Sequence, residues 1–598
     1  MPVNPMNPMV VQSDHTVLLE VDNPQYAEAR DALARFAELE KSPEHIHTYR
    51  LSPLSLWNAA ASGLGADGIV ESLVRYSKYD VPGNIQADVR DYVSRFGRLK
   101  LRQGAAGELL LTSDDPLLML EVSRNRKLRP LIREEIDQYT VRVDSGLRGH
   151  VKKALVDIGY PAEDLAGYVD GAGLSLHLLP AMRSAGQPFS LRHYQQDAVE
   201  VFHARGSVHG GSGVIVLPCG AGKTLVGMGV MEKLQTNTLI LTTNTVAVRQ
   251  WMDELHDKTS LHPADIGEYT GDVKEIRPVT VTTYQILTYR ERRKRGAAAN
   301  GESWFDEAPT DDELSQPLTP ASFPHFGLFR ERDWGLVIYD EVHLLPAPVF
   351  RMTAELQARR RLGLTATLVR EDGKEDHVFA LIGPKKYDVP WKDLERQGWI
   401  ASAHCHEIRL DMAPEQRFTY AMAGNREQAV LSATDPAKLS AVEEIIAKHP
   451  DDQVLVIGTY LEQLGEVASR LDAPLLTGKT KTRERQKLYQ QMREGTLRRL
   501  VVSKVANFAI DLPDVSVAIE ISGTFGSRQE EAQRLGRILR PKHDGRPAHF
   551  YAVVMRDTKD QTFAAKRQMF LTEQGYKYEI LYRDDLPNYD PERDHAVW

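Results

Sequence analysis

Short apolar runs alternate with amphipathic helical segments along two long stretches of the chain. The first stretch covers residues 190–383 and contains the runs VIVL, TLILTT, VTVTTY, GLVIYDEVH and RLGLTAT. The second begins near Asp452 and contains QVLVIGTY, RRLVVSK, VSVAIEISG and HFYAVVM. Runs rich in β-branched residues, separated by helices, are typical of parallel strands buried on both faces. We therefore predict an α/β fold in which two tandem parallel-sheet domains face a common cleft.

The segments outside these stretches have different patterns. Residues 412–446 show helical patterning without strong strand signals. Near the N-terminus, SPLSLWNAA, GADGIVESLVRYSK and PGNIQADVRDYVSRFG each predict a short helix. The next segment, RLKLRQGAAGELLLTS, predicts a hairpin around a glycine-containing turn. Three helices and a hairpin are typical of a winged-helix module, which could bind DNA or dock another protein.

These patterns divide the chain into five regions. We expect an N-terminal accessory α+β region at 1–125 and a second small domain at 126–188. The first parallel-sheet domain follows at 189–385, a connector with a helical insertion at 386–450, and the second parallel-sheet domain at 451–598. Within the first parallel-sheet domain, residues 296–328 contain acidic residues and prolines but no lysine or arginine. That composition is typical of a solvated insertion or linker.

Composition narrows the class of protein. The chain has 598 residues, of which 26% are charged and 42% hydrophobic, as in ordinary water-soluble proteins. No apolar run approaches the length of a membrane span, and no secretory signal is evident, so we expect a cytoplasmic protein without membrane contact. Two cysteines, Cys219 and Cys405, exclude a disulfide framework. The net charge of −9 argues against wholesale coating of nucleic acid but leaves room for a local basic groove.

Candidate chemistry begins at VIVLPCGAGKTLVG, where a buried run meets a glycine-rich turn and then Lys223 and Thr224. A strand, a glycine-rich turn and a helix that opens with Lys-Thr predict a P-loop, whose backbone N–H groups bind phosphates. Lys223 would reach the β- and γ-phosphates of ATP, and the Thr224 hydroxyl would ligate Mg²⁺. Leu217 stands where the longer form of the motif has glycine, so this is the shorter form. Its other cofactor-binding residues are Pro218, Cys219, Gly220, Ala221 and Gly222.

Two further motifs fit this P-loop. LVIYDEVH places Asp340 and Glu341 at the end of a buried strand, where Asp340 can hold Mg²⁺ and Glu341 can polarise the attacking water. EAQRLGRILRP supplies Gln533, Arg537 and Arg540. The two arginines lie three residues apart on one helical face. From the second domain they can enter the cleft as arginine fingers, which neutralise charge in the transition state.

Together these motifs resemble those of superfamily 2 helicases, and specifically the XPB (xeroderma pigmentosum group B) family of DNA repair helicases, in a bacterial-looking form. The similar segments, which span residues 189–581 in the family's order, are LRHYQQDAV, LPCGAGKTLVG, DEVHLLP, RLGLTATLVREDGK, SKVANFAIDLPDVSVAIEIS, GSRQEEAQRLGRILRPK and RQMFLTEQGYKYEIL. The resemblance implies RecA-like domains, ATP and Mg²⁺ as cofactors, and 3′→5′ DNA helicase or duplex translocase activity in nucleotide excision repair. It also implies DNA as partner, as single strand and as forked or damaged duplex, and a nuclease partner in microbial members. We expect the motor to act as a monomer.

The resemblance assigns roles to further parts of the chain. Arg192 and Gln195 would recognise adenine, and Asp511 would belong to the nucleotide site, although VANFAIDLP departs there from the family's glycine-bearing pattern. Residues 412–446 would form a thumb-like insertion. The second small domain would be related to a damage-recognition domain.

It also assigns a coupling segment. Thr365 and Thr367 would couple hydrolysis to domain movement. The charged tripeptide that follows, Arg370, Glu371 and Asp372, looks like the motif that the family uses in opening DNA. A charged loop of this kind is otherwise an ordinary solvated turn.

Polar residues that follow predicted strands are candidates for DNA contacts. They occur in TTNTVAVRQW and VTTYQIL of the first domain and in TGKTKTRERQK and VVSKV of the second. Short polar side chains and loop N–H groups can bind phosphates without reading bases. The candidates are Asn244, Thr245, Thr283, Tyr284, Lys479, Ser503 and Lys504. Because they occur in both domains, they favour a track for a single strand.

Two histidines form a separate candidate. AHCHEI places His404 and His406 on one face of a strand, where two imidazoles could begin a metal site. No third ligand is evident in the sequence, so a structural role is favoured.

Three other functions compete with a helicase. A duplex translocase would pump DNA without separating its strands, and an ATP-gated scaffold would recruit a partner on domain closure. The combination of Glu341, Arg537 and Arg540 disfavours a scaffold, which does not need hydrolytic groups. The sequence DEVH, in place of DEAD, disfavours an RNA helicase by analogy.

Overall fold

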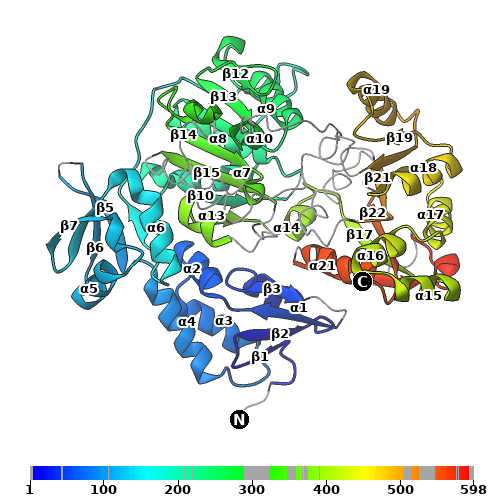
Figure 1. The fold of residues 1–598 in the computed structure, drawn as a ribbon, viewed down its shortest axis with the longest axis horizontal. Coiled ribbons are helices and arrows are strands. Elements are labelled where there is room, and N and C mark those ends of the chain that lie inside the picture. The colour runs from blue at the N-terminus through cyan, green and yellow to red at the C-terminus, as the bar shows by residue number, and fades with distance from the viewer. Residues whose placement is uncertain are drawn as a thin grey trace, which may run out of the picture.

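The computed structural model places the described residues in four sheets and the helices that cover them (Figure 1). These residues are 4–41, 45–105, 107–207, 209–218, 220–288, 324–345, 359–366, 368, 375–389, 391–503, 515–523, 546–573, 576 and 578–591. Ten of the predicted site residues lie outside them, namely Cys219, Thr367, Arg370, Glu371, Asp372, Lys504, Asp511, Gln533, Arg537 and Arg540.

The first parallel-sheet domain has seven described strands in the order β12-β13-β11-β14-β15-β10-β16. Every neighbouring pair in this sheet is parallel. The strands are β10 (Ser212–Val216), β11 (Thr238–Thr242), β12 (Ile266–Tyr269), β13 (Val279–Thr283), β14 (Leu336–Asp340), β15 (Arg360–Thr365) and β16 (Lys385–Asp388). β10, β11 and β13 are buried at every position, which is why their sequences are continuous apolar and β-branched runs.

Helices and short turns connect these strands. The elements that precede, connect and follow them are α7 (His193–His203), η3 (Ala204–Gly206), α8 (Lys223–Leu234), α9 (Thr245–Lys258), η4 (Pro263–Asp265), α10 (Tyr284–Thr288), η6 (Pro324–Phe329), η7 (Val342–Leu344) and α13 (Glu375–Leu381). The end of the segment expected to be a solvated insertion, residues 296–328, differs from that expectation. Residues 324–328 belong to η6, and Leu328 is buried with its carbonyl accepting a hydrogen bond from the Trp334 indole.

The second parallel-sheet domain repeats the design, with described strands in the order β19-β20-β18-β21-β22-β17-β23. All pairs in this sheet are parallel as well. The strands are β17 (Ala403–Leu410), β18 (Gln453–Gly458), β19 (Leu475–Leu476), β20 (Arg499–Ser503), β21 (Val515–Glu520), β22 (Ala548–Met555) and β23 (Tyr578–Tyr582). The prediction of two parallel-sheet domains is therefore confirmed.

The second parallel-sheet domain contains helices before, between and after its strands. They are α14 (Trp391–Arg396), α15 (Pro414–Met422), α16 (Asn425–Ala433), α17 (Ala437–Ala447), α18 (Leu461–Arg470), α19 (Thr482–Arg493), α21 (Lys559–Glu573) and η9 (Leu586–Asn588). The helix-rich segment 412–446 is confirmed as α15, α16 and α17. It is inserted within this sheet, because β17 precedes it and pairs with β22 and β23. The expected boundary between 450 and 451 thus lies after the first strand of the domain.

The N-terminal unit combines a four-stranded sheet, ordered β1-β2-β4-β3, with four helices. Its elements are β1 (Met9–Val11), β2 (Thr16–Glu20), α1 (Tyr26–Leu33), β3 (Glu38–Lys41), β4 (Ile46–Arg50), α2 (Pro53–Ala61), α3 (Ala66–Tyr76) and α4 (Gly83–Arg95). The three predicted helices correspond to α2, α3 and α4. β2 alternates between half-buried and buried positions, as expected for a sheet with one face toward a core.

The predicted hairpin belongs to a different unit. It forms β5 and β6 of a five-stranded sheet ordered β7-β8-β6-β5-β9. The elements of this unit are β5 (Leu99–Gln103), β6 (Leu109–Ser113), α5 (Pro116–Arg124), η1 (Arg129–Leu131), β7 (Ile132–Asp137), β8 (Thr140–Val143), η2 (Ser145–Leu147), α6 (Arg148–Asp157) and β9 (Glu163–Leu165). The winged-helix interpretation was wrong, because the hairpin and the three helices contribute to separate hydrophobic clusters. The expected boundary between 125 and 126 lies inside this sheet.

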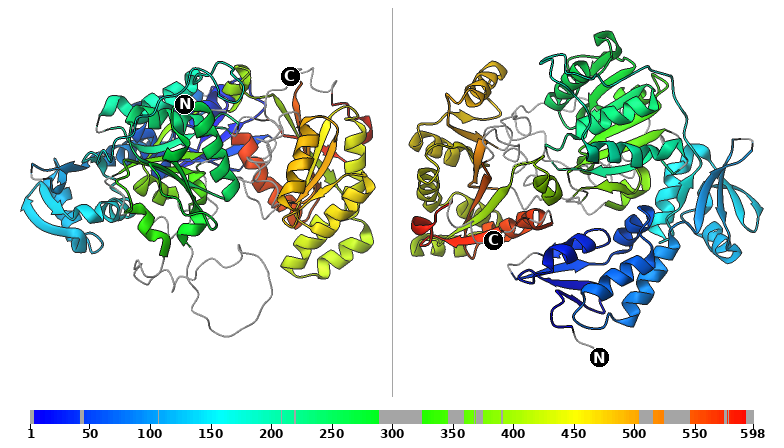
Figure 2. Two further views of the ribbon diagram at one scale, coloured as in Figure 1. Left: turned by 90° about the horizontal axis from the view of Figure 1, so that it is seen from above. Right: turned by 180° about the vertical axis from the view of Figure 1, so that it is seen from behind.

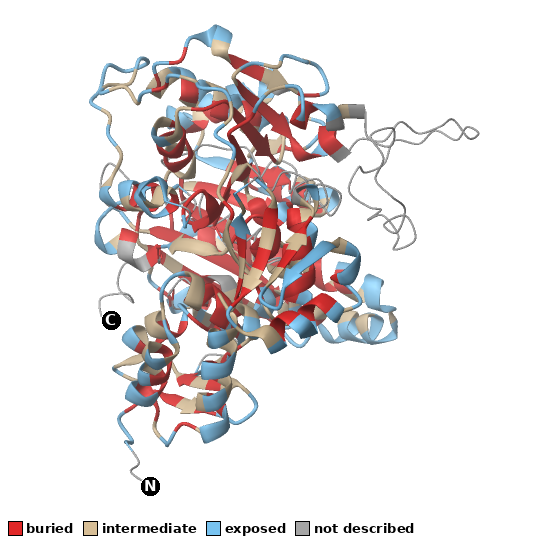
Figure 3. Ribbon diagram, turned by 90° about the vertical axis from the view of Figure 1, so that its left-hand side faces the viewer, coloured by how far each residue is buried: buried red, intermediate tan, exposed pale blue. Residues whose placement is uncertain are grey.

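The other three units are arranged around the first parallel-sheet domain (Figure 2). Figure 3 shows buried residues concentrated in the strands, with exposed residues on the covering helices. The second parallel-sheet domain contacts the N-terminal unit through α21, which lies beside β3 (Figure 1). This arrangement leaves the carboxyl ends of the parallel strands to carry the candidate site.

Candidate nucleotide and DNA site

The P-loop forms the turn between β10 and α8. Gly220 and Gly222 have φ angles of 81° and 80°, the left-handed region in which glycine carries no steric cost. Gly222 is also confined by its surroundings, because a Cβ there would lie 2.5 Å from Gln195 Nε2. The turn ends at Lys223 and Thr224, the first residues of α8, whose N–H groups lack intrahelical acceptors. The backbone N–H groups of the turn and of the start of α8 therefore lie where the sequence predicts that phosphates bind.

Gln195 supports this turn from α7. Its amide oxygen accepts a hydrogen bond from the Arg192 N–H at 2.9 Å, and its amide nitrogen donates to the Ala221 carbonyl at 2.8 Å. The Tyr194 hydroxyl donates to the same carbonyl, also at 2.8 Å. The Arg192 guanidinium lies 4.2 Å from the ring centroid of Trp399. These contacts show Gln195 positioning the P-loop, while adenine recognition by Arg192 and Gln195 stays a prediction.

A buried ion pair lies at the centre of the site. Lys223 Nζ is 3.0 Å from Glu341 Oε1, and both side chains are largely buried. Burial opposes ionisation of Glu341, but the Lys223 ammonium and then His343 outweigh it, so the pKa of Glu341 is lowered. Glu341 itself has φ 51°, a left-handed conformation that is costly for a residue with a side chain. The structure thus holds an ionised carboxylate against the P-loop lysine.

Asp340 differs from its neighbour in its electrostatics. Burial, and then the charge of Glu341, raise the pKa of Asp340. The Trp251 indole N–H donates to Asp340 Oδ2 at 2.9 Å, and this hydrogen bond lowers the pKa of Asp340. The Tyr284 hydroxyl donates to the Asp340 backbone carbonyl at 2.8 Å. The carboxylate of Asp340 and the hydroxyl of Thr224 are oxygen ligands of the kind that Mg²⁺ prefers.

Sequence reasoning missed the positioning role of Trp251. The residue lies on α9, 89 positions before Asp340, so no local pattern connects the two. One sequence feature is related to this contact: Gly227 in α8 lacks a side chain, which allows the Trp251 indole to approach the helix closely. A Cβ at Gly227 would lie 2.6 Å from the Trp251 ring.

A chain of contacts leads from Glu341 to the strand that precedes the coupling segment. His343 Nδ1 lies 3.5 Å from Glu341 Oε2 and 2.6 Å from the Thr365 hydroxyl. His343 and Thr365 are both buried, and Thr365 ends β15. A change in the charge or position of Glu341 can therefore reach Thr365 through one imidazole ring.

The predicted DNA contacts of the first domain fall into two groups. Asn244 caps α9 by accepting from the Ala247 N–H at 2.9 Å, and Thr245 is exposed beside it. Thr283 and Tyr284 are buried, and the Tyr284 hydroxyl is engaged with Asp340. Burial excludes Tyr284 from direct contact with a phosphate in this structure, and the residue supports the strand end that carries Asp340.

The predicted contacts of the second domain also differ in exposure. Lys479 is exposed in the turn after β19, where its N–H donates to the Thr477 hydroxyl at 3.2 Å. Ser503 ends β20 and is 3% exposed. Of these two, Lys479 is therefore the residue that a DNA strand could reach.

The structure adds a basic cavity that sequence reasoning missed. It has a volume of about 870 Å³ and lies between α16 and α21, with Arg426, Lys559, Phe563 and Lys566 in its lining. Lys559, Phe563 and Lys566 are spaced i, i+4, i+7 on α21, so they share one helical face. Two lysines and an aromatic ring at helical spacing were the available signal for a nucleic-acid contact.

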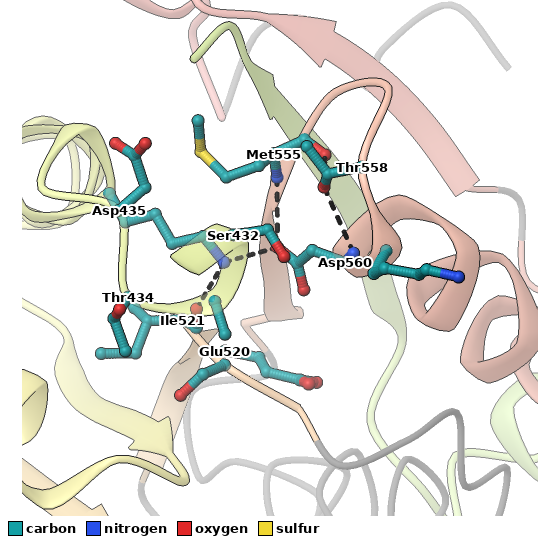
Figure 4. A network of polar contacts seen from close by, with 12 residues as sticks. Ser432, Thr434, Asp435, Glu520, Ile521, Met555, Thr558 and Asp560 are labelled. Atoms are coloured by element: carbon teal, nitrogen blue, oxygen red, sulfur yellow. Dashed lines mark hydrogen bonds and ion pairs between the residues drawn. The ribbon is translucent and has the colours of Figure 1, made fainter. Parts of the chain in front are cut away.

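A buried polar network anchors this cavity to the second sheet. Lys438 Nζ, on α17, donates to Asp560 Oδ2 at 2.6 Å and to the Ile521 carbonyl at 2.7 Å. Asp560 also accepts from the Met555 N–H, and its own N–H donates to the Thr558 hydroxyl (Figure 4). The network joins the helical insertion, the ends of β21 and β22, and the start of α21. It thereby fixes the helix that carries Lys559.

The two histidines of AHCHEI have structural partners. His406 Nε2 lies 3.0 Å from the Tyr589 hydroxyl, and His406 Nδ1 lies 3.2 Å from Glu579 Oε2. The His404 ring lies 5.4 Å from that of His549. Among the described residues no group of three or more histidine, cysteine, aspartate or glutamate side chains could hold a metal ion. Among all the residues that the structure describes, no helix has the length and apolar character needed to cross a membrane.

Comparisons with known proteins match the chain almost throughout. Residues 394–595 match the family model "ERCC3/RAD25/XPB C-terminal helicase", residues 188–370 match "Type III restriction enzyme, res subunit", and residues 9–137 match "Helicase conserved C-terminal domain". A protein of Kineococcus radiotolerans named "DNA 3'-5' helicase XPB" is 52% identical over 99% of both chains. One of the same name from Mycobacterium tuberculosis is 53% identical over 97% of this chain and 98% of the relative. A protein of Enterocytozoon bieneusi, named "General transcription and DNA repair factor IIH helicase/translocase subunit XPB", is 31% identical over 96% of this chain and 92% of its own length.

Proposed function

Because the chain belongs to the XPB family of DNA helicases, we propose that it is an ATP-dependent DNA helicase that moves 3′→5′ and acts in nucleotide excision repair. The observation that carries this proposal is the buried contact of Lys223 with Glu341, beside Asp340 and at the mouth of the P-loop. A lysine for phosphates, a carboxylate for the metal and a second carboxylate for water are the parts that ATP hydrolysis requires.

The residues divide the work of hydrolysis. Loop N–H groups and Lys223 bind the phosphates, so Lys223 exchanges its contact with Glu341 for one with the γ-phosphate. Thr224 and Asp340 would hold Mg²⁺, which neutralises charge on the phosphates when it is bound. Glu341, released from Lys223 and ionised at neutral pH, accepts a proton from the attacking water. The Trp251 N–H fixes the Asp340 carboxylate in position for the metal.

We propose that ATP hydrolysis is coupled to closure of the two parallel-sheet domains, which close only when ATP is bound. The contact chain of Glu341, His343 and Thr365 supports transmission from the nucleotide to the end of β15. Beyond that strand we assign Thr367 to the same coupling. In this proposal Arg537 and Arg540 reach the phosphates from the second domain, and domain closure brings them there.

DNA would follow the exposed ends of the parallel strands. Thr245 in the first domain and Lys479 in the second support a phosphate track, and the basic cavity between α16 and α21 extends it. Such a track binds the backbone and tolerates any sequence. Residues 370–372 would act at the fork, where Arg370 holds a phosphate and the acidic pair repels the displaced strand.

The test is an unwinding assay with 3′-tailed, 5′-tailed and blunt duplexes of the same sequence. We expect ATP-dependent unwinding of the 3′-tailed substrate and little of the other two. Preference for the 5′ tail would contradict the proposed polarity. ATP hydrolysis without unwinding of any substrate would contradict helicase activity.

A duplex translocase is the second candidate. It is favoured by the name of the Enterocytozoon relative, which combines helicase and translocase. A translocase would displace a third strand from blunt triplex DNA without separating the duplex. From the family resemblance we further propose a nuclease as partner and a monomeric motor, which co-purification and light scattering would test.

A further inference from the structure

An aromatic side chain of the second parallel-sheet domain reaches a candidate nucleotide residue of the first. The Arg192 guanidinium lies 4.2 Å from the centroid of the Trp399 ring, which is within the range of a cation–π contact. Arg192 immediately precedes α7, whereas Trp399 lies between α14 and β17. Figure 1 shows α14 between the two domains. The contact therefore crosses from one parallel-sheet domain to the other.

The end of α14 holds Trp399 on the second domain. Gly398 has a φ angle of 72° and ends the helix in the left-handed conformation. The Trp399 N–H then donates to the Leu394 carbonyl at 2.9 Å. At the start of the same helix, Trp391 meets the ring of Tyr576 edge to face, with centroids 6.2 Å apart. The backbone of Trp399 is thus fixed to the second domain, while the residue stays 37% exposed.

Arg192 occupies an electrostatically unfavourable position. It is the residue before the first turn of α7, where the helix dipole disfavours a positive charge. Among the residues that the structure describes, no carboxylate pairs with it, and the π face of Trp399 supplies the compensating attraction. Arg192 Nη1 donates to the Tyr194 hydroxyl at 3.3 Å, and that hydroxyl donates to the Ala221 carbonyl at 2.8 Å. A chain of contacts therefore runs from Trp399 to the P-loop.

The kind of contact matters for what Arg192 can do next. An arginine that recognises a base loses side-chain freedom when the base binds, and this loss weakens binding. An aromatic ring that already restricts the guanidinium makes the loss smaller. A carboxylate would do so by accepting the N–H groups, whereas a π face attracts the cation and leaves N–H groups available to a base.

We propose that Trp399 is a positioning residue for base recognition, because it holds the Arg192 guanidinium ready for adenine. The inference rests on the proposed use of ATP and adds how the base is distinguished. Because Trp399 belongs to the second domain, the affinity for adenine nucleotides depends on where that domain lies relative to the first.

The test compares ADP with UDP, which share the ribose and the diphosphate and differ in the base. Both are titrated by calorimetry into the full-length chain at one fixed Mg²⁺ concentration. We expect the unsubstituted chain to bind ADP more tightly than UDP. Trp399→Ala should weaken ADP by roughly fivefold and change UDP by less than about twofold. Equal weakening of ADP and UDP would mean that the ring supports the whole site, and would overturn the proposal.

Variants separate the π face from the bulk of the ring. Trp399→Phe keeps an aromatic face and should restore part of the ADP affinity, whereas Trp399→Leu should behave as Trp399→Ala does. Gln397→Ala removes the acceptor of the Trp399 indole N–H, which lies at 3.1 Å, and should leave ADP binding unchanged. Full ADP affinity in Trp399→Leu would overturn the proposal.

The matched control uses the same kind of contact elsewhere in the second domain. Tyr582, on the edge strand β23, lies under the Arg556 guanidinium at 5.8 Å and is 45% exposed. Tyr582→Ala should change neither ADP nor UDP binding. A loss of ADP affinity equal to that of Trp399→Ala would mean that removal of any exposed ring from this domain has the effect, and would also overturn the proposal.

A double substitution shows whether Trp399 acts through Arg192. Arg192→Ala should weaken ADP at least as much as Trp399→Ala does. In the Arg192→Ala chain, adding Trp399→Ala should change ADP affinity by less than about twofold, because the two residues share one contact. Fully additive effects would contradict the positioning role. In steady-state hydrolysis, Trp399→Ala should raise the KM for ATP by roughly fivefold with a smaller change in kcat.

The outcomes distinguish this inference from the proposed function. Equal affinity of the unsubstituted chain for ADP and UDP would overturn the inference alone. Absence of ADP binding would overturn both. A chain that shows the expected ADP results but unwinds no duplex would contradict the helicase activity and leave the role of Trp399 in place.

Discussion

The Lys223–Glu341 ion pair sets what a single substitution at the nucleotide site should do. Glu341→Gln removes the group that accepts the water proton and keeps the shape of the side chain. We expect ATP hydrolysis to fall by at least about 100-fold, measured in single-turnover experiments. ATP affinity should hold or increase, because Lys223 no longer has a carboxylate partner to leave.

The matched control is Glu466→Gln, an exposed glutamate that pairs with Arg470 on α18. It should leave both hydrolysis and ATP binding unchanged. Hydrolysis near the wild-type rate in Glu341→Gln would mean that another group activates the water.

Trp251 gives a pH prediction with a defined sign. Its N–H stabilises the ionised form of Asp340 and so lowers a pKa that burial and Glu341 raise. Trp251→Phe should raise the pKa of Asp340 further, so the carboxylate ionises only at higher pH. At limiting Mg²⁺, the acid limb of the ATPase profile should therefore move to higher pH. Trp334→Phe removes a buried indole donor to the Leu328 carbonyl and should leave the limb in place. An unmoved limb in Trp251→Phe would show that the hydrogen bond does not tune the metal ligand.

At this scale the sequence predicts the residues whose chemistry is local. Lys223 and Thr224 were identified because they follow a glycine-rich turn at the start of a helix, and Asp340 and Glu341 because they stand at the end of a buried strand. The supporting donor Trp251 was not, because its contact depends on the packing of α9 against β14. The positioning role of Gln195 likewise required the distance from α7 to the P-loop.

At the scale of the elements, a buried charge pair between Lys438 and Asp560 connects the helical insertion to the second sheet. Lys438→Met would leave Asp560 buried with its negative charge uncompensated. We expect a loss of about 3–5 kcal/mol in the free energy of local unfolding, read from hydrogen exchange of α17 and α21. An exposed pair offers the comparison, since Arg470→Ala should cost less than about 1 kcal/mol. Equal effects of the two substitutions would contradict the structural role of the buried pair.

The face of α21 that carries Lys559 and Lys566 gives a prediction on DNA. Replacing both by glutamate should weaken single-stranded DNA binding by about tenfold or more and reduce the salt slope by roughly 1.4, at about 0.7 per phosphate contact. Lys100→Glu with Lys127→Glu makes the same charge change on the five-stranded unit and should have little effect. An unchanged salt slope in the α21 variant would remove this face from the DNA track.

Element patterns explain which strands the sequence predicts. β10, β11, β13 and β18 are buried on both faces or nearly so, and their apolar runs are continuous. Among the strands missed, β16 has the sequence KKYD and no buried position, so its pattern carries no apolar signal. The hairpin of β5 and β6 was predicted correctly, but its assignment to a winged helix was not. Local pattern identifies a hairpin and does not identify the sheet that it joins.

At the scale of the whole molecule, the described part of the N-terminal unit contacts both parallel-sheet domains of the motor. Lys385 N–H donates to Asn58 Oδ1 at 3.0 Å, and Trp57 packs on Phe379, both in the first parallel-sheet domain. β3 meets α21 of the second domain (Figure 1). The unit therefore bridges both motor domains. Composition and periodicity give no information on such contacts, because they join segments more than 300 residues apart.

The segment before the motor also differs from the boundary expected at 188/189. Leu176 is 1% exposed within the core of the first parallel-sheet domain. Gly173 forms a β-bridge with Thr236, and Leu178 with Thr259. This segment is continuous with the domain that it covers, so the motor begins near residue 167.

Two truncated chains test this assignment. A chain that starts at Gly167 keeps the covering segment, and one that starts at Ala181 loses Leu176 together with both bridges. Removing a buried leucine costs about 2–5 kcal/mol, so the shorter chain should unfold at a clearly lower temperature. Both retain Lys223, Asp340 and Glu341, and the longer chain should keep ATPase activity because Arg192 is the first of its nucleotide residues. Equal melting temperatures would mean that residues 167–180 pack only loosely and that the motor begins where the sequence suggested.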